Sequence, residues 1–231
     1  MGISKSLNTI YQTMYKAYGP QHWWPGETPF EVMIGAILTQ NTSWTNVEKA
    51  VSNLKTHRWL SPKKLSEIED VKLAQAIRSA GYFNQKTKKL KNFISFFKEK
   101  YQFSIKKMKV PEVYVMRNEL LEVNGIGPET ADSILLYALE KPVFVIDAYT
   151  KRIFSRLGLC NEDISYHDLQ NLFMRNLKKD ATKFNEYHAL IVYHGKYLCK
   201  KTKPLCDQCC LSTVCEYGKS TKLTLNDTHL S

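Results

Sequence analysis

The stretch from Leu120 to Lys151, which reads LLEVNGIGPETADSILLYALEKPVFVIDAYTK, decides the fold of this chain. At its centre, Gly125-Ile126-Gly127 separates two runs with apolar residues at helical spacing, 113–123 and 130–139. Two glycines between two helices allow a tight hairpin and expose backbone N–H groups at the start of the second helix. These groups and the positive end of the helix dipole can bind a phosphate. The sequence therefore predicts a helix-hairpin-helix motif that is either a phosphate-binding site or an ordinary helical corner.

The rest of the chain shows helical periodicity and no alternation of useful length that would indicate a β-strand. Apolar stripes and N-cap residues predict further helices at 3–18, 30–38, 44–57, 62–68, 70–81, 84–100, 148–157, 166–177 and 184–198. Ser43, Ser61 and Ser165 are the expected N-caps of three of these helices. The predicted fold class is all-α.

The composition indicates a globular protein with a basic surface. The 231 residues allow one large domain or two small ones, and 43% of them are hydrophobic. The formal net charge of +11 and the pI of about 9.3 favour a partner with many phosphates. The sequence contains neither a run of about 18 apolar residues, as a membrane span requires, nor the apolar core of a signal peptide. We therefore expect a cytoplasmic, nucleoid-associated monomer without a membrane partner.

The cysteines are concentrated near the C-terminus in the pattern Cys199-x6-Cys206-x2-Cys209-x5-Cys215. Four thiolates at short spacing can ligate zinc or an iron–sulfur cluster. The paired C-x-x-C knuckles that are typical of zinc are missing, because only Cys206 and Cys209 form one. Cysteines without a ligand remain the third alternative, and we expect Cys160 and Cys210, which fall outside the pattern, to be structural.

The first gap of this pattern holds three lysines, Lys200, Lys201 and Lys203. A metal centre would stiffen the loop and present these lysines to a nucleic-acid backbone. The alternative is a solvated charge run without a partner.

Two motifs in this chain resemble the same family. The pattern L-x-x-V-N-G-I-G-P-E-T-A-D, followed by V-F-V-I-D-A-Y-T-K-R, resembles the helix-hairpin-helix, Gly/Pro, Asp signature of the endonuclease III superfamily of DNA glycosylases. The cysteine spacing matches the iron–sulfur loop of that superfamily, which implies a [4Fe–4S] cluster as the cofactor. The resemblance spans about residues 1–217 and implies a six-helix bundle domain with the hairpin at 24–141, an iron–sulfur domain formed by 1–23 and 142–217, and a flexible tail at 218–231.

The resemblance also assigns catalytic positions. In this superfamily, enzymes that also cut the DNA strand carry a lysine two residues after the second hairpin glycine, where this chain has Glu129. A carboxylate cannot form the Schiff base that strand cleavage requires. The aspartate of the signature is Asp147, which is also a candidate N-cap of the next helix. An ionised Asp147 would stabilise the positive charge on deoxyribose as the glycosidic bond breaks.

The base pocket and the DNA contacts are predicted from the same resemblance. Trp23-Trp24-Pro25 and the aromatic residue Trp44 resemble the DNA-3-methyladenine glycosylase III branch, although each tryptophan could instead fill the core. Gln40 and Asn41 lie where the family inserts a polar side chain into the gap left by the flipped nucleotide, unless they are helix C-cap residues. Because an aromatic face attracts a cation, such a pocket would favour alkylated, positively charged purines.

These observations predict a monofunctional glycosylase that removes an alkylated purine such as 3-methyladenine from damaged double-stranded DNA. The second hypothesis is an enzyme of the same fold with another substrate: an oxidised pyrimidine with lyase activity, or uracil or thymine in a mismatch. The third is a DNA-binding iron–sulfur protein without catalytic activity, which would not need Asp147.

Overall fold

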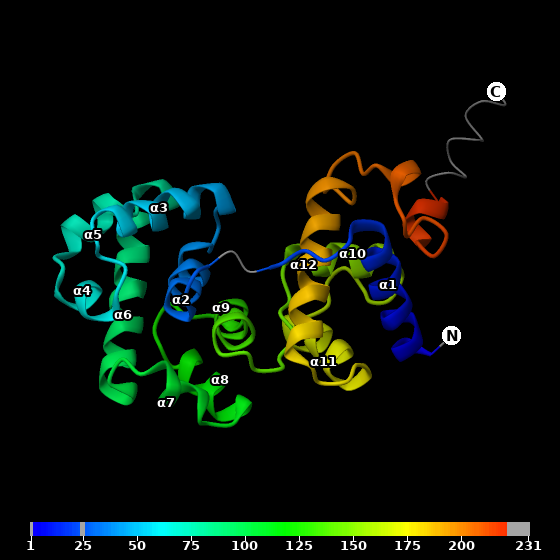
Figure 1. The fold of residues 1–231 in the computed structure, drawn as a ribbon. Coiled ribbons are helices and arrows are strands. Elements are labelled where there is room, and N and C mark those ends of the chain that lie inside the picture. The colour runs from blue at the N-terminus through cyan, green and yellow to red at the C-terminus, as the bar shows by residue number, and fades with distance from the viewer. Residues whose placement is uncertain (1, 24–25, 221–231) are drawn as a thin grey trace. The chain divides into compact units, whose positions relative to one another are not determined.

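The computed structural model describes residues 2–23 and 26–220, and every regular element within these ranges is helical (Figure 1). The all-α prediction is therefore confirmed for the described part of the chain. None of the helices in it is long and apolar enough to cross a membrane. The chain divides into two compact units: unit 1 contains Met1–Trp23 and Phe144–Ser231, and unit 2 contains Trp24–Val143. Whether these units behave as the predicted bundle domain and iron–sulfur domain stays a prediction.

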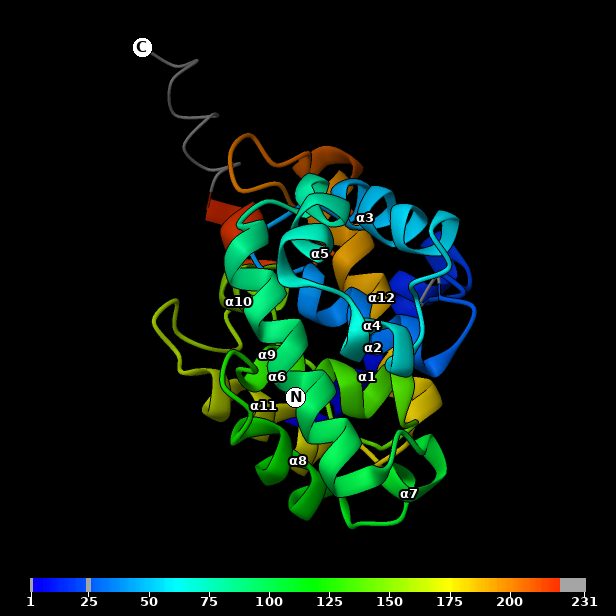
Figure 2. The same ribbon diagram turned by 90° about the vertical axis from the view of Figure 1, so that its left-hand side faces the viewer.

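Unit 2 is built around α2 (Pro29–Leu38), whose residues from Phe30 to Leu38 are all buried. A helix that is apolar on every side must be enclosed by other elements. In the order of the chain the other elements of unit 2 are α3 (Trp44–Thr56), α4 (Pro62–Glu67), α5 (Asp70–Ala76), η1 (Arg78–Ala80), α6 (Phe83–Tyr101), α7 (Ile105–Lys109), α8 (Val113–Leu121), α9 (Pro128–Ser133) and η2 (Ile134–Ala138). Of these, α3, α6, α9 and η2 pack directly on α2. Helices α3, α4, α5 and α6 face the viewer in Figure 2.

Unit 1 contains α1 (Ile3–Tyr18), α10 (Ala148–Arg156), α11 (Tyr166–Asn176), α12 (Ala181–Tyr197) and the short η3 (Cys206–Gln208). Helix α12 packs on α10 and α1, and α1 also packs on α11. Aromatic rings fill the space between them, with Phe144 stacked on Phe173 at a centroid distance of 3.9 Å and Tyr187 edge-on to both rings. Such buried rings contribute a large share of the apolar area that a helical unit removes from water.

Most predicted helices form with small differences at their ends, but the helix expected at 130–139 is two elements, α9 and η2. Ser61 and Ser165 cap α4 and α11 through their hydroxyl groups, whereas Ser43 occupies the N-cap position of α3 without a side-chain hydrogen bond. The helix expected at 70–81 is two elements, α5 and η1. Helix α7 was not predicted, because five residues are too few to show a helical period. Residues 216–220 form a last helical turn, and the remainder of the predicted tail, 221–231, lies outside the described residues.

Candidate functional site

The hairpin turn of unit 2 has a geometry that only glycine adopts easily at Gly125. This residue has φ of +97°, in the left-handed region, and a Cβ atom at this position would overlap the side chain of Lys89 on α6. Gly127 is the N-cap of α9 and Pro128 is its first residue, an arrangement that starts a helix without losing a backbone hydrogen bond. Ile126 is 5% exposed and anchors the turn in the core. The predicted hairpin is therefore present, and its geometry requires a glycine at position 125.

A buried ion pair holds the two hairpin helices together. Arg117 on α8 donates from Nε and one Nη atom to the two carboxylate oxygens of Asp132 on α9, at 2.7 and 3.0 Å. Asp132 is completely buried. Bidentate pairs of this kind fix orientation as well as contributing energy. This pair was not predicted from the sequence, although a charged residue on the buried face of a helix was a signal for it.

The loop between α2 and α3 contacts the hairpin through Gln40. Its side-chain nitrogen Nε2 donates to the backbone carbonyl oxygen of Gly125 at 3.1 Å and to the hydroxyl of Thr130 at 2.9 Å. Its side-chain oxygen Oε1 accepts a hydrogen bond from Lys89. The Gln40 side chain is thus used within unit 2. Its neighbour Asn41 is exposed and has φ of +54°. Of the two residues predicted to enter DNA, Asn41 has the accessible side chain.

The structure does not test the prediction that three tryptophans form a base pocket. Trp44 is the first residue of α3, is partly exposed and donates from its indole nitrogen to Glu48 at 2.7 Å. Trp23 is also partly exposed but belongs to unit 1. Trp24 lies outside the described residues. The base pocket therefore stays a prediction.

Asp147 begins α10 as its N-cap, as the sequence predicted. Its Oδ1 atom accepts hydrogen bonds from the backbone N–H of Thr150 at 2.7 Å and from the Thr150 hydroxyl at 2.8 Å. These donors and the positive end of the helix dipole stabilise the ionised carboxylate. The Oδ2 atom lies 3.6 Å from Nε2 of His188 on α12. Burial lowers the pKa of His188 and the charge of Asp147 only partly opposes this, so the imidazole is neutral near pH 7.

Glu129 is the second residue of α9 and is exposed. Its carboxylate lies in the first turn of that helix, where the helix dipole favours a negative charge. No amine occupies this position of the hairpin. Glu129 belongs to unit 2 and Asp147 to unit 1.

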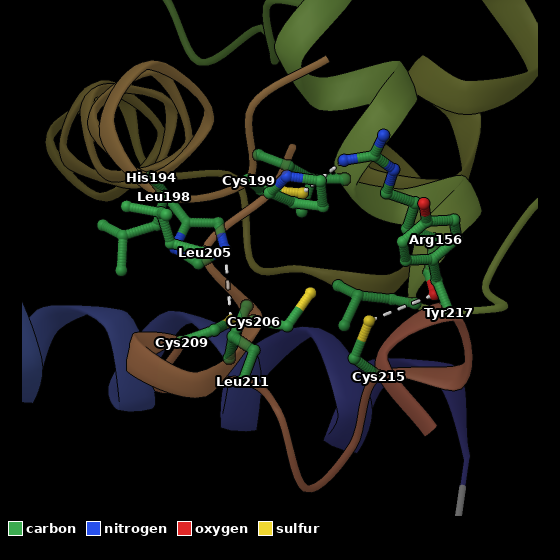
Figure 3. Close-up of a pocket in the computed structure, with 13 residues that line it drawn as sticks. Arg156, His194, Leu198, Cys199, Leu205, Cys206, Cys209, Leu211, Cys215 and Tyr217 are labelled. Atoms are coloured by element: carbon green, nitrogen blue, oxygen red, sulfur yellow. Dashed lines mark hydrogen bonds between the residues drawn. The ribbon is translucent and has the colours of Figure 1, made fainter. Parts of the chain in front are cut away.

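The four cysteines of the sequence pattern line one pocket in unit 1. Cys199, Cys206, Cys209 and Cys215 surround a space of about 370 Å³ that is partly open to solvent, together with apolar side chains from α10 and the cysteine loop (Figure 3). Cys160 and Cys210 are not part of its lining. Among the residues that the structure describes, no three thiol, imidazole or carboxylate groups converge closely enough to hold a single metal ion. The pocket thus separates the four pattern cysteines from the other two.

Hydrogen-bond donors point at two of these four sulfur atoms, and a histidine ring nitrogen lies near a third. Arg156 donates to the Cys199 sulfur at 3.3 Å, the backbone N–H of Gly218 to the Cys215 sulfur at 3.4 Å, and Nε2 of His194 lies 3.7 Å from the Cys209 sulfur. Without a bound metal, burial raises the pKa of the Cys209 thiol to about 11. Donors and nearby positive charge stabilise thiolates, which are the form that ligates metals. Burial and the Arg156 carbonyl oxygen, which accepts from the Cys215 thiol at 3.3 Å, favour the neutral thiols, so a bound metal would have to supply the charge that holds these sulfur atoms as thiolates.

His194 is held by α1 on its other side. The Tyr18 hydroxyl lies 2.7 Å from Nδ1 of His194 and 3.1 Å from the sulfur of Cys210. Burial, together with the charge of Arg152, lowers the pKa of His194 to about 4. The N-terminal helix is thereby connected to the cysteine loop, a contact between residues far apart in the sequence.

The lysine loop is exposed, and α10 holds its backbone. Lys200, Lys201 and Lys203 are all exposed. The Arg156 guanidinium donates to the carbonyl oxygens of Lys200 at 2.8 Å and of Lys201 at 3.0 Å. Arg152, one turn earlier on the same helix, donates to the carbonyl oxygens of Gly195 and Cys199 at 2.8 and 2.9 Å. Neither arginine was singled out from the sequence, because their partners lie more than 40 positions away.

Known proteins resemble this chain over most of its length. A protein of Methanocaldococcus jannaschii that is provisionally named a DNA repair glycosylase is 50% identical over 207 residues, which cover 89% of this chain and 94% of the relative. Endonuclease III of Sulfolobus acidocaldarius is 29% identical over 189 residues, which cover 81% of this chain and 82% of that protein.

Solved structures show the same fold. A non-covalent complex of endonuclease III with DNA matches with a TM-score of 0.83 at 24% identity and covers 96% of this chain and 99% of that one. The Helicobacter pylori 3-methyladenine DNA glycosylase, solved with 1,N6-ethenoadenine bound, matches with a TM-score of 0.72 at 31% identity, with 85% of this chain and 98% of that chain covered.

The family model for HhH-GPD superfamily base excision DNA repair proteins matches residues 34–179, a range that contains both the hairpin and Asp147. This range is more than half of the chain, and the structure forms the hairpin and the helix capped by Asp147 within it. The protein therefore belongs to the HhH-GPD superfamily of base excision repair DNA glycosylases.

Proposed function

We propose that this protein is a monofunctional DNA glycosylase, which removes an alkylated purine from double-stranded DNA by hydrolysis and leaves the strand intact. The observation that carries the proposal is the exposed carboxylate of Glu129 at the hairpin position where strand-cutting relatives carry a lysine. A carboxylate cannot attack the sugar to form a Schiff base, so water remains the nucleophile.

Asp147 supplies the electrostatic part of the chemistry. As the bond between C1′ and the base nitrogen breaks, its electron pair leaves with the base and positive charge develops on the sugar. The Asp147 carboxylate, held at the N-terminus of α10 by Thr150, stabilises that charge. A water molecule then adds to C1′ and releases a proton. An alkylated purine is cationic before cleavage and leaves as a neutral base, so no strong general acid is required.

The preference for an alkylated purine rests on aromatic side chains and on one relative. Trp44 is partly exposed at the start of α3, and an aromatic face favours a cationic base by its quadrupole. We assign Trp23 and Trp24 to the same pocket on the resemblance described above. The 31% identity to the Helicobacter pylori 3-methyladenine DNA glycosylase supports this substrate class.

Asn41 is the residue that we assign to the gap left by the flipped nucleotide, because its side chain is exposed on a loop anchored by Gln40. Tyr82, which the sequence analysis did not single out, is a second residue available to DNA. It is 65% exposed and has φ of +45°, an unusual conformation for an aromatic residue. Strained, exposed residues of this kind are often found at functional sites.

We also propose that Cys199, Cys206, Cys209 and Cys215 hold a [4Fe–4S] cluster. Their common pocket and the donors that reach the Cys199 and Cys215 sulfur atoms support this assignment. The sequence lacks the paired C-x-x-C knuckles that are typical of zinc, because only Cys206 and Cys209 form one. The cluster would link the loop covalently and hold Lys200, Lys201 and Lys203 in place for the DNA backbone, as a structural centre.

The proposal is tested with duplexes that each carry one defined lesion, by measuring base release and strand scission separately. We expect release of 3-methyladenine or a related alkylated purine, an abasic strand that breaks only on treatment with alkali, and no adduct trapped by borohydride. Asp147→Asn should lower the rate of base release by roughly a hundredfold or more and leave binding to abasic DNA nearly unchanged. Efficient trapping of the wild-type protein by borohydride, or full activity of Asp147→Asn, would contradict the monofunctional mechanism.

The second candidate function is that of a glycosylase with lyase activity on oxidised pyrimidines. The 29% identity to endonuclease III of Sulfolobus acidocaldarius favours it. The same experiment separates the two candidates, because a lyase would be trapped by borohydride and would cut the strand without alkali. Activity on duplexes with a uracil or thymine mismatch is measured in the same series.

A further inference from the structure

A lysine is buried at the start of α6 in unit 2. Lys86 is 2% exposed, and its ammonium group donates to the backbone carbonyl oxygen of Leu38 at 2.9 Å and to that of Ala80 at 2.6 Å. Both partners are neutral carbonyl groups. Burying an ammonium group against neutral partners costs free energy, and burial together with the charge of Lys89 lowers the pKa of Lys86 to about 8.

The two carbonyl groups belong to the starts of two different loops. Leu38 is the last residue of α2 and precedes the loop that presents Asn41. Ala80 is the last residue of η1 and precedes Gly81 and Tyr82, both of which have positive φ. One ammonium group therefore joins two loops that each contain an exposed side chain on a left-handed residue, Asn41 with φ of +54° and Tyr82 with φ of +45°.

The next turn of α6 extends this connection to the hairpin. Lys89 donates to the side-chain oxygen Oε1 of Gln40, and the side-chain nitrogen Nε2 of Gln40 donates to the backbone carbonyl oxygen of Gly125 at 3.1 Å. The side chain of Lys89 also fills the space where a Cβ atom of Gly125 would lie. Two lysines on one face of α6 thus hold three loops of unit 2 in a fixed relation.

If this position served stability alone, a lysine would be unfavourable there, because burying its charge costs free energy. An apolar side chain of similar length would remove the cost of burying the charge, although the two carbonyl groups would lose a donor. Helix C-termini, such as the end of α2 at Leu38, attract positive charge, which partly offsets the cost. An apolar residue cannot hydrogen-bond to the ends of both α2 and η1, as the Lys86 ammonium group does.

We propose that Lys86 is a positioning residue for lesion recognition, which fixes the spacing between Asn41 and Tyr82 without touching DNA itself. Lys86 has this role only if the protein is the DNA glycosylase proposed above. Recognition of a flipped nucleotide depends on side chains that enter the duplex at defined places, and a small displacement of a loop is enough to weaken it. Lys86 thereby acts on selectivity for damaged DNA rather than on general affinity.

The test compares Lys86→Met with Lys88→Met, which removes the same charge from an exposed position on the same helix. Affinity is measured for a duplex with one abasic site and for the matching undamaged duplex, and thermal unfolding checks the fold of each variant. We expect Lys86→Met to lower the ratio of the two affinities by roughly tenfold. Lys88→Met should keep the wild-type ratio.

A double-mutant cycle checks that Lys86 acts through the loops. In an Asn41→Ala and Tyr82→Ala background, Lys86→Met should have little further effect on the ratio, because the side chains that it positions are absent. If Lys86→Met does not fold, Lys86→Gln, which keeps two N–H donors on a shorter neutral side chain, is compared in the same way and should lower the ratio.

The outcomes separate this inference from the proposed function. A wild-type protein that shows no preference for the abasic duplex overturns both. A wild-type preference that the Lys86 variants retain, or one that Lys88→Met loses to the same extent, overturns the role of Lys86 alone. An undiminished effect of Lys86→Met in the double-alanine background also overturns it.

Discussion

The Nε2 atom of His188 lies 3.6 Å from the Oδ2 atom of Asp147, and the exposed fractions of the two side chains are only 7% and 12%. His188 comes from α12 and Asp147 from the start of α10, so the packing of these two helices creates the contact. Because burial lowers the pKa of His188 below its ordinary value of 6.5, the Asp147 carboxylate faces a neutral ring near pH 7. Under the proposed function, this arrangement leaves the negative charge of Asp147 available for the developing sugar cation.

The His188 contact predicts a pH dependence of stability. Below pH 6.5 the unfolded chain takes up a proton at His188 and the folded chain does not, until the pH falls to the lowered folded pKa. Because the unfolded state binds more protons in this window, the free energy of unfolding should fall as the pH is lowered from 6.5 toward the folded pKa. His188→Gln should lack this part of the dependence in urea unfolding experiments. The exposed His167 gives the control variant, His167→Gln. Parallel curves for wild type and His188→Gln would show that the imidazole is not held neutral.

The buried ion pair of the hairpin predicts that Asp132→Asn lowers the free energy of unfolding strongly. Asp132→Asn keeps the shape of the side chain and removes the negative charge that pairs with Arg117, at a site where Asp132 is completely buried. Breaking such a pair costs about 3–5 kcal/mol of unfolding free energy, and the 19% exposure of Arg117 places the expected cost at about 3 kcal/mol. The exposed pair between Lys72 and Glu69 provides the control, since Glu69→Gln should cost less than about 1 kcal/mol. Urea unfolding measures both, and equal effects would be inconsistent with a buried clamp.

The thiol pocket predicts a difference between neighbouring cysteines. Purified protein should contain about four irons per chain. Cys206→Ser should lose most of the iron and lower the unfolding temperature, because the loss of a ligand releases the loop. Cys210→Ser should retain the iron, since Cys210 lies outside the pocket lining. Metal analysis and visible absorbance decide the matter, and one zinc with no iron would overturn the cluster assignment.

The lysine loop predicts how DNA binding responds to salt. If about five phosphates are neutralised, the plot of log affinity against log salt concentration should have a slope of roughly −4 to −5. Changing Lys200, Lys201 and Lys203 to glutamine together should reduce the slope by about 2–3, because each lost phosphate contact removes about 0.9. Changing the exposed Lys63, Lys64 and Lys72 lowers the net charge equally and should leave most of the slope in place. The same slope for both triple variants would mean that net charge, and not this loop, drives binding.

Features that depend on short spacing could be predicted from the sequence. The two glycines of the hairpin, the N-cap Asp147 and the cysteine pattern are each specified within a few residues, because a helix terminus, a tight turn and a ligand loop are local structures. The all-α class followed in the same way from helical periodicity. The short helix α7 escaped prediction because it contains too few residues to show a period.

The contacts between residues far apart in the sequence became known from the packing of the helices. Helical periodicity shows which face of a helix is buried, but not which side chain of another helix lies against it. For this reason the pairing of Asp147 with His188, of Gln40 with Gly125 and of Lys86 with the ends of α2 and η1 could not be derived from the sequence. Each of these contacts joins separate segments through a buried polar group, which must find a partner when the helices pack and water is excluded.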